Sequence, residues 1–356
     1  MYFMNMLATT GARHSFVRQA ESCRSSGSDF VAAVLEAVDR QLALAPMSSR
    51  MVQDWTGDPA AAAVALRVNG ALHALARRGS PQYLADLYRG EHDDFDGAIA
   101  EALLREDQFI ADWIRDPTQT NEVARGAAIM SALMTIAAER QMPFQILELG
   151  SSCGLNLNLA RYAYRLGGVA AGDPASPVHI EPQWRGADPP AAPVSILSAH
   201  GVDLNPLSAQ DAAHRERLLS FTWADQPARS RRLEAALAVA IAHPPQVHRG
   251  DAKLWLTQRL AERQPDRVCR AVVHTMFLQY LSDRDRQEIA AMMAAAGAGA
   301  SADRPLVEIS FEWTPDRREV QLRCTRWPDG HSAVLATCHP YGDWVAWRGG
   351  GDGGRV

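Results

Sequence analysis

Four features that could do chemistry each follow directly after an apolar, strand-like run. They are the glycine-rich turn at residues 150–154, Asp203, Asp251 and His274. The carboxyl ends of parallel strands meet at one edge of a sheet, where α/β proteins bind ligands, so we expect these features to converge. A single acid after a strand is often only a helix cap. Three such residues behind a glycine turn instead favour a cofactor site.

The turn lies in QILELGSSCGLNLNLARYAY, residues 145–164, which indicates a strand, a glycine turn and a helix. Its pattern E-x-G-x-S-x-G suits a nucleotide-type cofactor. The same residues also fit G-x-S-x-G, in which Ser152 would be the nucleophile of a serine esterase. That chemistry needs strands and an oxyanion loop upstream, and we expect neither there, although either Asp251 or Asp283, together with His339, could complete a triad. A turn without any ligand is the third possibility.

The spacing of apolar residues divides the chain into a helical part and an alternating part. Helical periodicity predicts helices at residues 31–44, 60–75, 98–114 and 122–138, and no strand is expected before residue 145. From there, strands are predicted at 145–149, 194–202, 247–250, 268–273 and 306–313, with helices at 155–164, 218–242 and 283–296. A hairpin should join 319–327 to 332–339, and the Gly- and Pro-rich residues 167–193 read as an inserted loop or hairpin.

The predicted fold class is therefore α/β, with a Rossmann-like mixed sheet that is mostly parallel and ends in an antiparallel hairpin. An all-helical domain precedes the sheet. We expect a flexible N-terminus at 1–14, the helical domain at 15–140, the Rossmann-like domain at 141–348 and a disordered tail at 349–356. This organisation would place the glycine turn at the start of the second domain.

Composition narrows the possible functions. The chain has 356 residues, of which 47% are hydrophobic and 22% charged, with a net charge of −5. That charge gives no electrostatic footprint for nucleic acid. The five scattered cysteines argue against disulfides and a zinc site, so we expect no metal. We also expect no secretory signal and no membrane span, and hence a cytoplasmic location.

Two resemblances rest on these motifs. ELGSSCG, GVDLNP, RGDA and VVHTMF resemble the successive motifs of class I S-adenosylmethionine-dependent methyltransferases, over about residues 120–347. TNEVAR, ELGSSCGLNLN, DLNPL and HPYGDW resemble more closely an uncharacterised bacterial domain-of-unknown-function family, DUF2332. The second resemblance implies a fold but no substrate.

The methyltransferase resemblance implies a set of residues that bind S-adenosylmethionine. Asp203 would hold the ribose and Asp251 the adenine, while Glu148 opens the first motif. The other members of the cofactor set lie in or just after the turn: Gly150, Ser151, Ser152, Gly154 and Asn156. Ser152 departs from the glycine that many methyltransferases have there. Glu181 is an alternative ribose acid, because it lies nearer to the turn than Asp203 does.

His274 is a candidate acid–base residue, with a neutral histidine bonded to the backbone as the equally plausible alternative. Tyr280 is a second catalytic candidate. Residues that could face the substrate are Asn121, Glu122, Arg125, His339 and Tyr341. The resulting hypothesis is methyl transfer from S-adenosylmethionine to a small molecule. The alternatives are a non-catalytic cofactor-binding module of the same fold and an esterase using Ser152.

Overall fold

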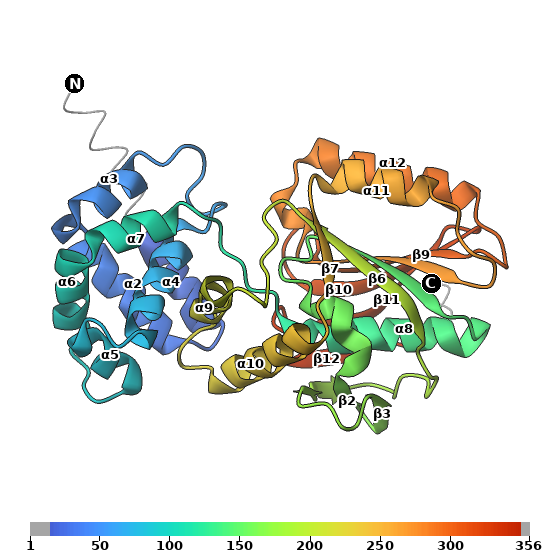
Figure 1. Cartoon of the computed structure of the whole chain (residues 1–356), viewed down its shortest axis with the longest axis horizontal. Helices are drawn as coiled ribbons and strands as arrows, with labels where there is room; N and C mark the ends of the chain where they lie inside the picture. The colour runs from blue at the N-terminus through green and yellow to red at the C-terminus, as the bar shows by residue number, and fades with distance from the viewer. Residues whose placement is uncertain (1–14, 350–356) are drawn as a thin grey trace. The chain divides into compact units, whose positions relative to one another are not determined.

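The computed structural model describes residues 15–349, and the chain forms two compact units (Figure 1). One unit comprises the described residues up to Thr120 together with Ala212–Arg231. The other comprises Asn121–Asp211 and the residues from Arg232 onward. The chain therefore leaves the second unit, contributes a segment to the first, and returns within one helix.

The first unit is helical. Its elements are α2 (Asp29–Gln41), the 3₁₀ turn η1 (Leu42–Leu44), α3 (Pro46–Gln53), α4 (Val64–Arg77), α5 (Gln82–Arg89), α6 (Phe95–Arg105) and α7 (Asp107–Ile114). Nearly all of α4 is buried, and α2, α5 and α7 pack against it. The predicted helix at 98–114 is two helices, because the first ends before Glu106 and α7 begins at the next residue.

The segment that returns to this unit contains α9 (Ala212–Ser220) and the first turn of α10 (Pro227–Ala242). His73 of α4 places its Nδ1 3.0 Å from the carbonyl oxygen of Ser220. Arg217 donates to the carbonyl oxygen of Asp116 at 2.8 Å. The predicted single helix at 218–242 is broken before Pro227, which begins α10. These contacts explain why a segment lying between two strands of the second unit belongs to the helical unit.

The second unit is built on a 9-stranded mixed sheet with the order β5-β12-β11-β10-β9-β8-β1-β6-β7. Its strands are β1 (Phe144–Leu149), β5 (Gln183–Arg185), β6 (Ile196–Asp203), β7 (Gln246–Arg249), β8 (Cys269–Thr275), β9 (Leu306–Trp313), β10 (Val320–Trp327), β11 (His331–Cys338) and β12 (Trp344–Trp347). The strands from β7 to β9 are all parallel, whereas β9 to β12 form an antiparallel meander. The predicted α/β class, with a mostly parallel mixed sheet and helices at the N-terminus, is confirmed.

Helices cover both faces of this sheet (Figure 1). On one face, α11 (Ala252–Ala261) and α12 (Asp283–Ala298) pack over a core that includes Leu147, Leu149 and Val272. On the other face, α8 (Gly126–Arg140) contacts β9, β10 and β11. Side chains alternate along a strand, so Glu148 points to the face opposite Leu147 and Leu149.

The predicted helix at 155–164 is wrong. Residues Leu155–Arg161 form a short 3₁₀ helix, η3, and the chain then enters a strand, β2 (Ala163–Leu166). Leu155, Leu157 and Leu159 occupy every second position, and the intervening Asn156 and Asn158 are buried as well. Because this segment is enclosed on all sides, it has no single apolar face of the kind that supports an amphipathic helix.

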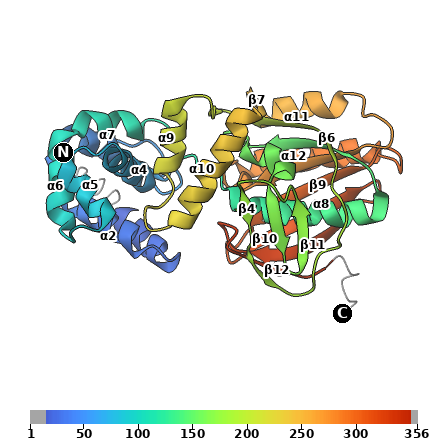
Figure 2. The ribbon, with the colours of Figure 1, turned by 60° about the horizontal axis from the view of Figure 1, so that its bottom comes forward.

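The Gly- and Pro-rich insertion pairs with β2 in a small sheet with the order β3-β2-β4; β2 and β3 are labelled in Figure 1 and β4 in Figure 2. The strands β2 and β3 (Val169–Gly172) make an antiparallel hairpin, and β4 (His179–Ile180) pairs in parallel with β2. β2 packs beside α8. β5, farther along the insertion, joins the edge of the large sheet next to β12. The insertion therefore contributes an edge strand as well as a hairpin.

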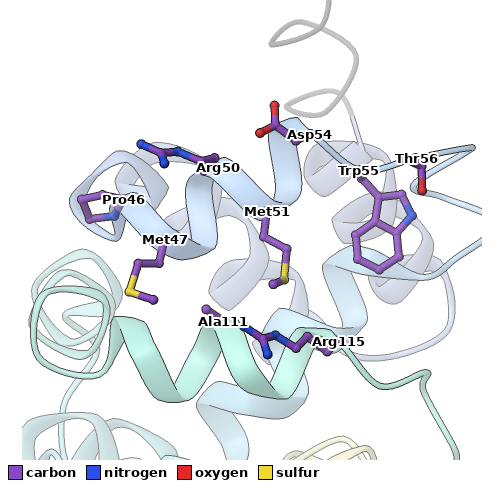
Figure 3. A pocket seen from close by; sticks show the side chains of 9 residues that line it. All are labelled: Pro46, Met47, Arg50, Met51, Asp54, Trp55, Thr56, Ala111 and Arg115. Atoms are coloured by element: carbon purple, nitrogen blue, oxygen red, sulfur yellow. The ribbon is translucent and has the colours of Figure 1, made fainter.

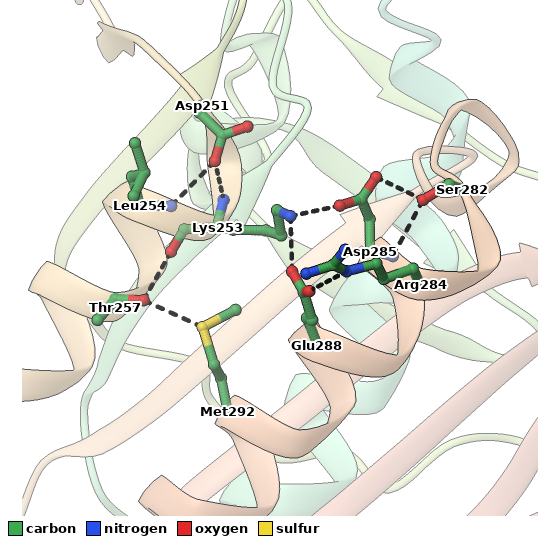
Figure 4. Close-up of polar contacts among 9 residues, drawn as sticks. All are labelled: Asp251, Lys253, Leu254, Thr257, Ser282, Arg284, Asp285, Glu288 and Met292. Atoms are coloured by element: carbon green, nitrogen blue, oxygen red, sulfur yellow. Dashed lines mark hydrogen bonds and ion pairs between the residues drawn. The ribbon is translucent and has the colours of Figure 1, made fainter.

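A cluster of ionic contacts joins α11 to α12 (Figure 4). Lys253 of α11 contacts Asp285 and lies 2.7 Å from Glu288, both on α12. Ser282, just before α12, caps the helix by accepting from the amide of Asp285 at 3.1 Å. These carboxylates raise the pKa of Lys253, chiefly through hydrogen bonding. The cluster lies at the surface, where salt screens such contacts.

Two further findings concern only residues 15–349. No helix in this range combines the length and the apolar character needed to cross a bilayer. In the same range, no three His, Cys, Asp or Glu side chains are grouped so that they could hold a metal ion.

Gly154 provides a test of how the glycine turn packs. It has φ +75°, and an added Cβ would lie 2.6 Å from Val247 Cγ2. We expect Gly154→Ala to lower the free energy of unfolding by about 1–3 kcal/mol. Gly250→Ala is the matched control, because nothing lies within 4 Å of its added Cβ. Urea unfolding of both variants would measure the difference, and equal stability would contradict the close packing at Gly154.

Candidate functional site

The glycine turn is anchored to the neighbouring strand β6. Gly150 and Ser151 donate their amides to the carbonyl oxygen of Val202 at 2.9 and 3.1 Å. Gly150 has φ +67°, and the ring of Phe277 lies where its Cβ would be. The turn ends at Gly154, from which η3 begins. Its first two amides are therefore used for pairing with β6, so they do not form an open cradle for an anion.

Asp203 at the end of β6 fixes the middle of the turn. Its Oδ2 accepts from the amide of Ser152 at 2.9 Å, and its Oδ1 accepts from the amide of Asn205 at 2.8 Å. Ser152 adopts φ +55°, which is uncommon for a residue other than glycine. The carboxylate thus joins the two strand ends that the sequence predicted to converge.

Glu148, the last but one residue of β1, is a buried acid with only 2% of its surface exposed. Asn156 of η3 donates to its Oε1 at 3.3 Å. Burial raises the pKa of this carboxyl to about 8, and the nearby Asp203 adds to the effect, whereas Asn156 and Arg125 oppose it. Glu148 is therefore mostly protonated at neutral pH.

Three buried polar atoms near the end of β1 have no hydrogen-bond partner among the residues that the structure describes: Glu148 Oε2, Ser151 Oγ and Asn156 Oδ1. The three residues are between 0% and 3% exposed. Buried polar atoms are nearly always paired, so a group of unpaired ones indicates a place for a ligand or an ordered water. Because a protonated acid and a hydroxyl can also donate, the group can serve both a donor and an acceptor.

The expected substrate-side residues partly come together around η2 (Val123–Arg125). Asn121 accepts from the amide of Leu155 at 3.0 Å, directly beside the turn. Glu122 caps η2 and lies 3.7 Å from Arg232. The Nε of Arg125 donates to the carbonyl oxygen of Pro340 at 2.9 Å. This one segment therefore contacts both the glycine turn and the HPYGDW loop.

His339 and Tyr341 belong to that loop. His339 Nδ1 lies 3.0 Å from Asp343 Oδ2, and the rings of His339 and Tyr341 are 5.7 Å apart. Gly342 packs against Ala124 so closely that a Cβ would be 2.7 Å from the Ala124 carbonyl carbon. The loop is thus held against η2.

His274 lies between two glutamates of β9. Its Nδ1 is 2.8 Å from Glu312 Oε1, and its Nε2 is 3.5 Å from Glu308 Oε1. Burial disfavours the charged ring, but the hydrogen bonds and charges of the two glutamates together outweigh it and raise the pKa to about 9. Both ring nitrogens are engaged and the ring is mostly protonated at neutral pH. His274 in this arrangement is an ion-pair partner with no nitrogen open to a substrate.

Glu312 also orders the loop that follows β8. Its Oε1 accepts from the amide of Phe277 at 2.9 Å. Neither glutamate was among the predicted site residues. The signal that could have found them is two acids, four residues apart, in the otherwise apolar strand LVEISFEW, because such acids face the same side of the sheet.

Asp251 caps α11. Its Oδ1 accepts from the amides of Lys253 and Leu254, both at 3.0 Å (Figure 4). Within the part of the chain that the structure describes, its Oδ2 has no hydrogen bond. Tyr280 ends the short η4 (Leu278–Tyr280) and is 67% exposed. Asp251 therefore lies just after a strand end, as predicted, but its carboxylate caps a helix, and Tyr280 lies in a 3₁₀ turn beyond the end of β8.

Exposed apolar side chains occur at the same edge of the sheet. Leu204 is 66% exposed after β6, Leu254 is 69% exposed after β7, and Tyr280 follows β8. Exposed large apolar residues that gather in one place commonly mark a binding surface. The sequence did not predict that these side chains are exposed, because a leucine or tyrosine at such a position carries no sign of its exposure.

We call the glycine turn, Asp203 and the buried atoms of Glu148, Ser151 and Asn156 the strand-end site. With the fold, this site defines an α/β protein that has a mostly parallel mixed sheet and an added helical unit. Comparison with protein families gives the more particular identification. The family described as "Uncharacterized protein conserved in bacteria (DUF2332)" matches residues 13–347, so the chain belongs to this family. No curated protein and no solved structure matches the chain.

The ion pairs of His274 predict a dependence of stability on pH. Below about pH 6.5 the histidine is protonated in both the folded and the unfolded chain, so the ion pairs contribute fully. Between pH 6.5 and about 9 only the unfolded chain loses this proton, and the free energy of unfolding falls by a few kcal/mol. Urea unfolding across this range would measure the decline.

In His274→Gln this part of the decline should be missing, although the variant is less stable overall because two glutamates lose their partner. Glu148 adds a separate decline between pH 4.5 and about 8, since its carboxyl stays protonated longer in the folded chain. The histidine variants are therefore compared in the Glu148→Gln background, where this second decline is absent. His331→Gln, at an exposed histidine, is the matched control for His274→Gln. An unchanged decline in His274→Gln would contradict the assignment.

Proposed function

We propose that the second unit is a Rossmann-like, S-adenosylmethionine-dependent methyltransferase that acts on a small molecule. The observation that carries the proposal is the group of buried, unpaired polar atoms of Glu148, Ser151 and Asn156 at the end of β1. Such a group costs stability unless a partner satisfies it. A cofactor that brings an ammonium and a carboxylate would provide donors and acceptors together.

The order of the parallel strands supports this proposal. In chain order β1, β6, β7, β8 and β9, they are arranged as β7-β6-β1-β8-β9, so the order reverses between β1 and β8. A third-second-first-fourth-fifth order is that of Rossmann-type sheets, which bind their ligand outside the strand ends at this reversal. The loops after β1 and β8 flank the reversal, and they carry the glycine turn and Phe277.

The acids at the strand ends would hold the two ends of the adenosyl group. Both oxygens of Asp203 already accept an amide, but each carboxylate oxygen has a second lone pair for a ribose hydroxyl. The Oδ2 of Asp251 is available to accept from the exocyclic amine of adenine. Glu148, Ser151 and Asn156 would contact the amino-acid part.

Two features change how such a cofactor would be held. η3 is too short to present a helix dipole, and the first amides of the turn are bonded to Val202. Binding would therefore depend on side chains more than on backbone amides. Bound S-adenosylmethionine supplies an electrophilic methyl group, so the protein's task is to position the acceptor and exclude water.

The exposed residues Leu204, Leu254 and Tyr280 favour an acceptor with an apolar body. No observation favours His274 as a base, since both of its nitrogens are engaged by glutamates. The esterase alternative is less well supported, because His339 pairs with Asp343, whereas the acids expected for its triad have other partners: Asp251 caps α11 and Asp283 contacts Arg286. A non-catalytic module would bind the cofactor equally well, but it would transfer no methyl group to any acceptor.

Binding of S-adenosylhomocysteine to the full chain, measured by calorimetry, tests the site. We expect Asp203→Asn and Asp251→Asn to weaken binding about tenfold or more, because each loses a charged acceptor. Asparagine keeps the capping ability of Asp251, so folding should be preserved. Asp283→Asn is the matched control, since Asp283 is an exposed acid at the start of α12. Unchanged binding in both site variants would overturn the cofactor assignment.

The protonation of Glu148 gives a second test. With a pKa of about 8, this carboxyl is mostly protonated at pH 7, and an ammonium bound beside it would favour the ionised form. We expect about one proton to be released per bound ligand at pH 7. Calorimetry in two buffers with different ionisation enthalpies measures that number. Glu148→Gln should release none from this position, and equal release by both proteins would contradict the role of Glu148.

A further inference from the structure

A cavity lies in the helical unit, between α3 and α7 (Figure 3). Its volume is about 570 Å³, within the range of small-molecule sites. Its lining includes Met47, Arg50, Met51, Trp55, Ala111 and Arg115. None of them belongs to the strand-end site, so this cavity calls for its own explanation.

Helix α3 has an inverted distribution of polar and apolar residues. Its buried residues are Ser48, Ser49 and Val52, whereas Met47 is 45% exposed and Met51 is half-buried. Ser48 is accommodated in the interior because its hydroxyl donates to Asp107 at 2.7 Å. A helix that needed only to pack would place its methionines inward. Here both methionines line the cavity, one helical turn apart (Figure 3).

The apolar surface of the cavity is suited to a flat, apolar group. Trp55 lines the cavity (Figure 3). The guanidinium of Arg67 lies 4.8 Å from the centre of its ring and so helps to hold the ring in place. Ala111 of α7 leaves room opposite the methionines. Methionine side chains are flexible and polarisable, and they pack well against aromatic rings.

The rim of the cavity carries more positive than negative charge. The lining residues include two arginines, Arg50 and Arg115, but only one acid, Asp54. Among residues 15–349, the guanidinium of Arg50 has no hydrogen bond or ion pair, and that of Arg115 has only a surface contact with Asp112 at 3.4 Å. Arginine binds planar carboxylates through two parallel hydrogen bonds. A partner with one carboxylate would therefore find a cation that is not already committed.

We propose that this cavity is a binding site for a small aromatic carboxylate. The aromatic ring packs on Trp55, Met47 and Met51, and the carboxylate pairs with an arginine of the rim. The inference does not rest on the proposed methyltransferase activity, because the residues involved belong to the helical unit. It assigns a binding role to the inverted face of α3, which the packing of the unit does not require.

Calorimetric titration of the full chain with naphthalene-2-carboxylate tests the proposal. The neutral naphthalene-2-carboxamide has nearly the same shape, so it isolates the contribution of charge. We expect the carboxylate to bind with a submillimolar Kd and the amide to bind about tenfold more weakly. Equal binding of the two, or equally strong binding of inorganic phosphate, would overturn the proposal.

Variants locate the site. Arg115→Gln should weaken carboxylate binding about tenfold, and Met51→Glu should abolish it by placing a negative charge in the apolar surface. Arg105→Gln is the matched control, because Arg105 is similarly exposed and also pairs with an acid of its own helix. Thermal unfolding checks that each variant is folded. If Arg105→Gln weakens binding as much as Arg115→Gln, the ligand is held by general surface charge and the proposal fails.

Discussion

The strand-end site depends on the Asp203 carboxylate, which accepts hydrogen bonds from the backbone amides of Ser152 and Asn205. Its position follows from the parallel pairing of β1 with β6, because that pairing brings Leu149 beside Val202. Because η3 begins directly after the glycine turn, Asn156 lies where its side chain can donate a hydrogen bond to Glu148. A buried acid and the amide that donates to it thus come together because two strand ends are held in register.

The parallel strands at the centre of the large sheet could be predicted well because most of them are apolar runs of limited length between turn residues. The strand at 306–313 has the predicted bounds. The segment after the turn could not be predicted in the same way, since its leucines alternate and its asparagines are buried by distant parts of the chain. The placement of α9 with the helical unit depends on Arg217 and Ser220, whose partners lie about a hundred residues away or more. Local periodicity carries no information about such contacts.

The candidate site was predictable in position more than in role. Asp203, Asp251 and His274 do lie at strand ends, but an acid that caps a helix and an acid that binds a ligand look the same in a sequence. The structure separates them by their partners. Asp251 has two amides of α11, and His274 has two glutamates of β9. Glu148 is different because one of its oxygens has no hydrogen-bond partner within residues 15–349.

This difference bears on function through stability. A paired group such as His274 gains nothing from a ligand, because its interactions are already made within the fold. The unpaired oxygen of Glu148 and the outward methionines of α3 each break a rule that stable folding favours, one by leaving polar atoms unsatisfied and the other by exposing apolar surface. A ligand that satisfies either would stabilise the folded chain by mass action. The two places that lower stability in the free protein are therefore those where binding has the most to contribute.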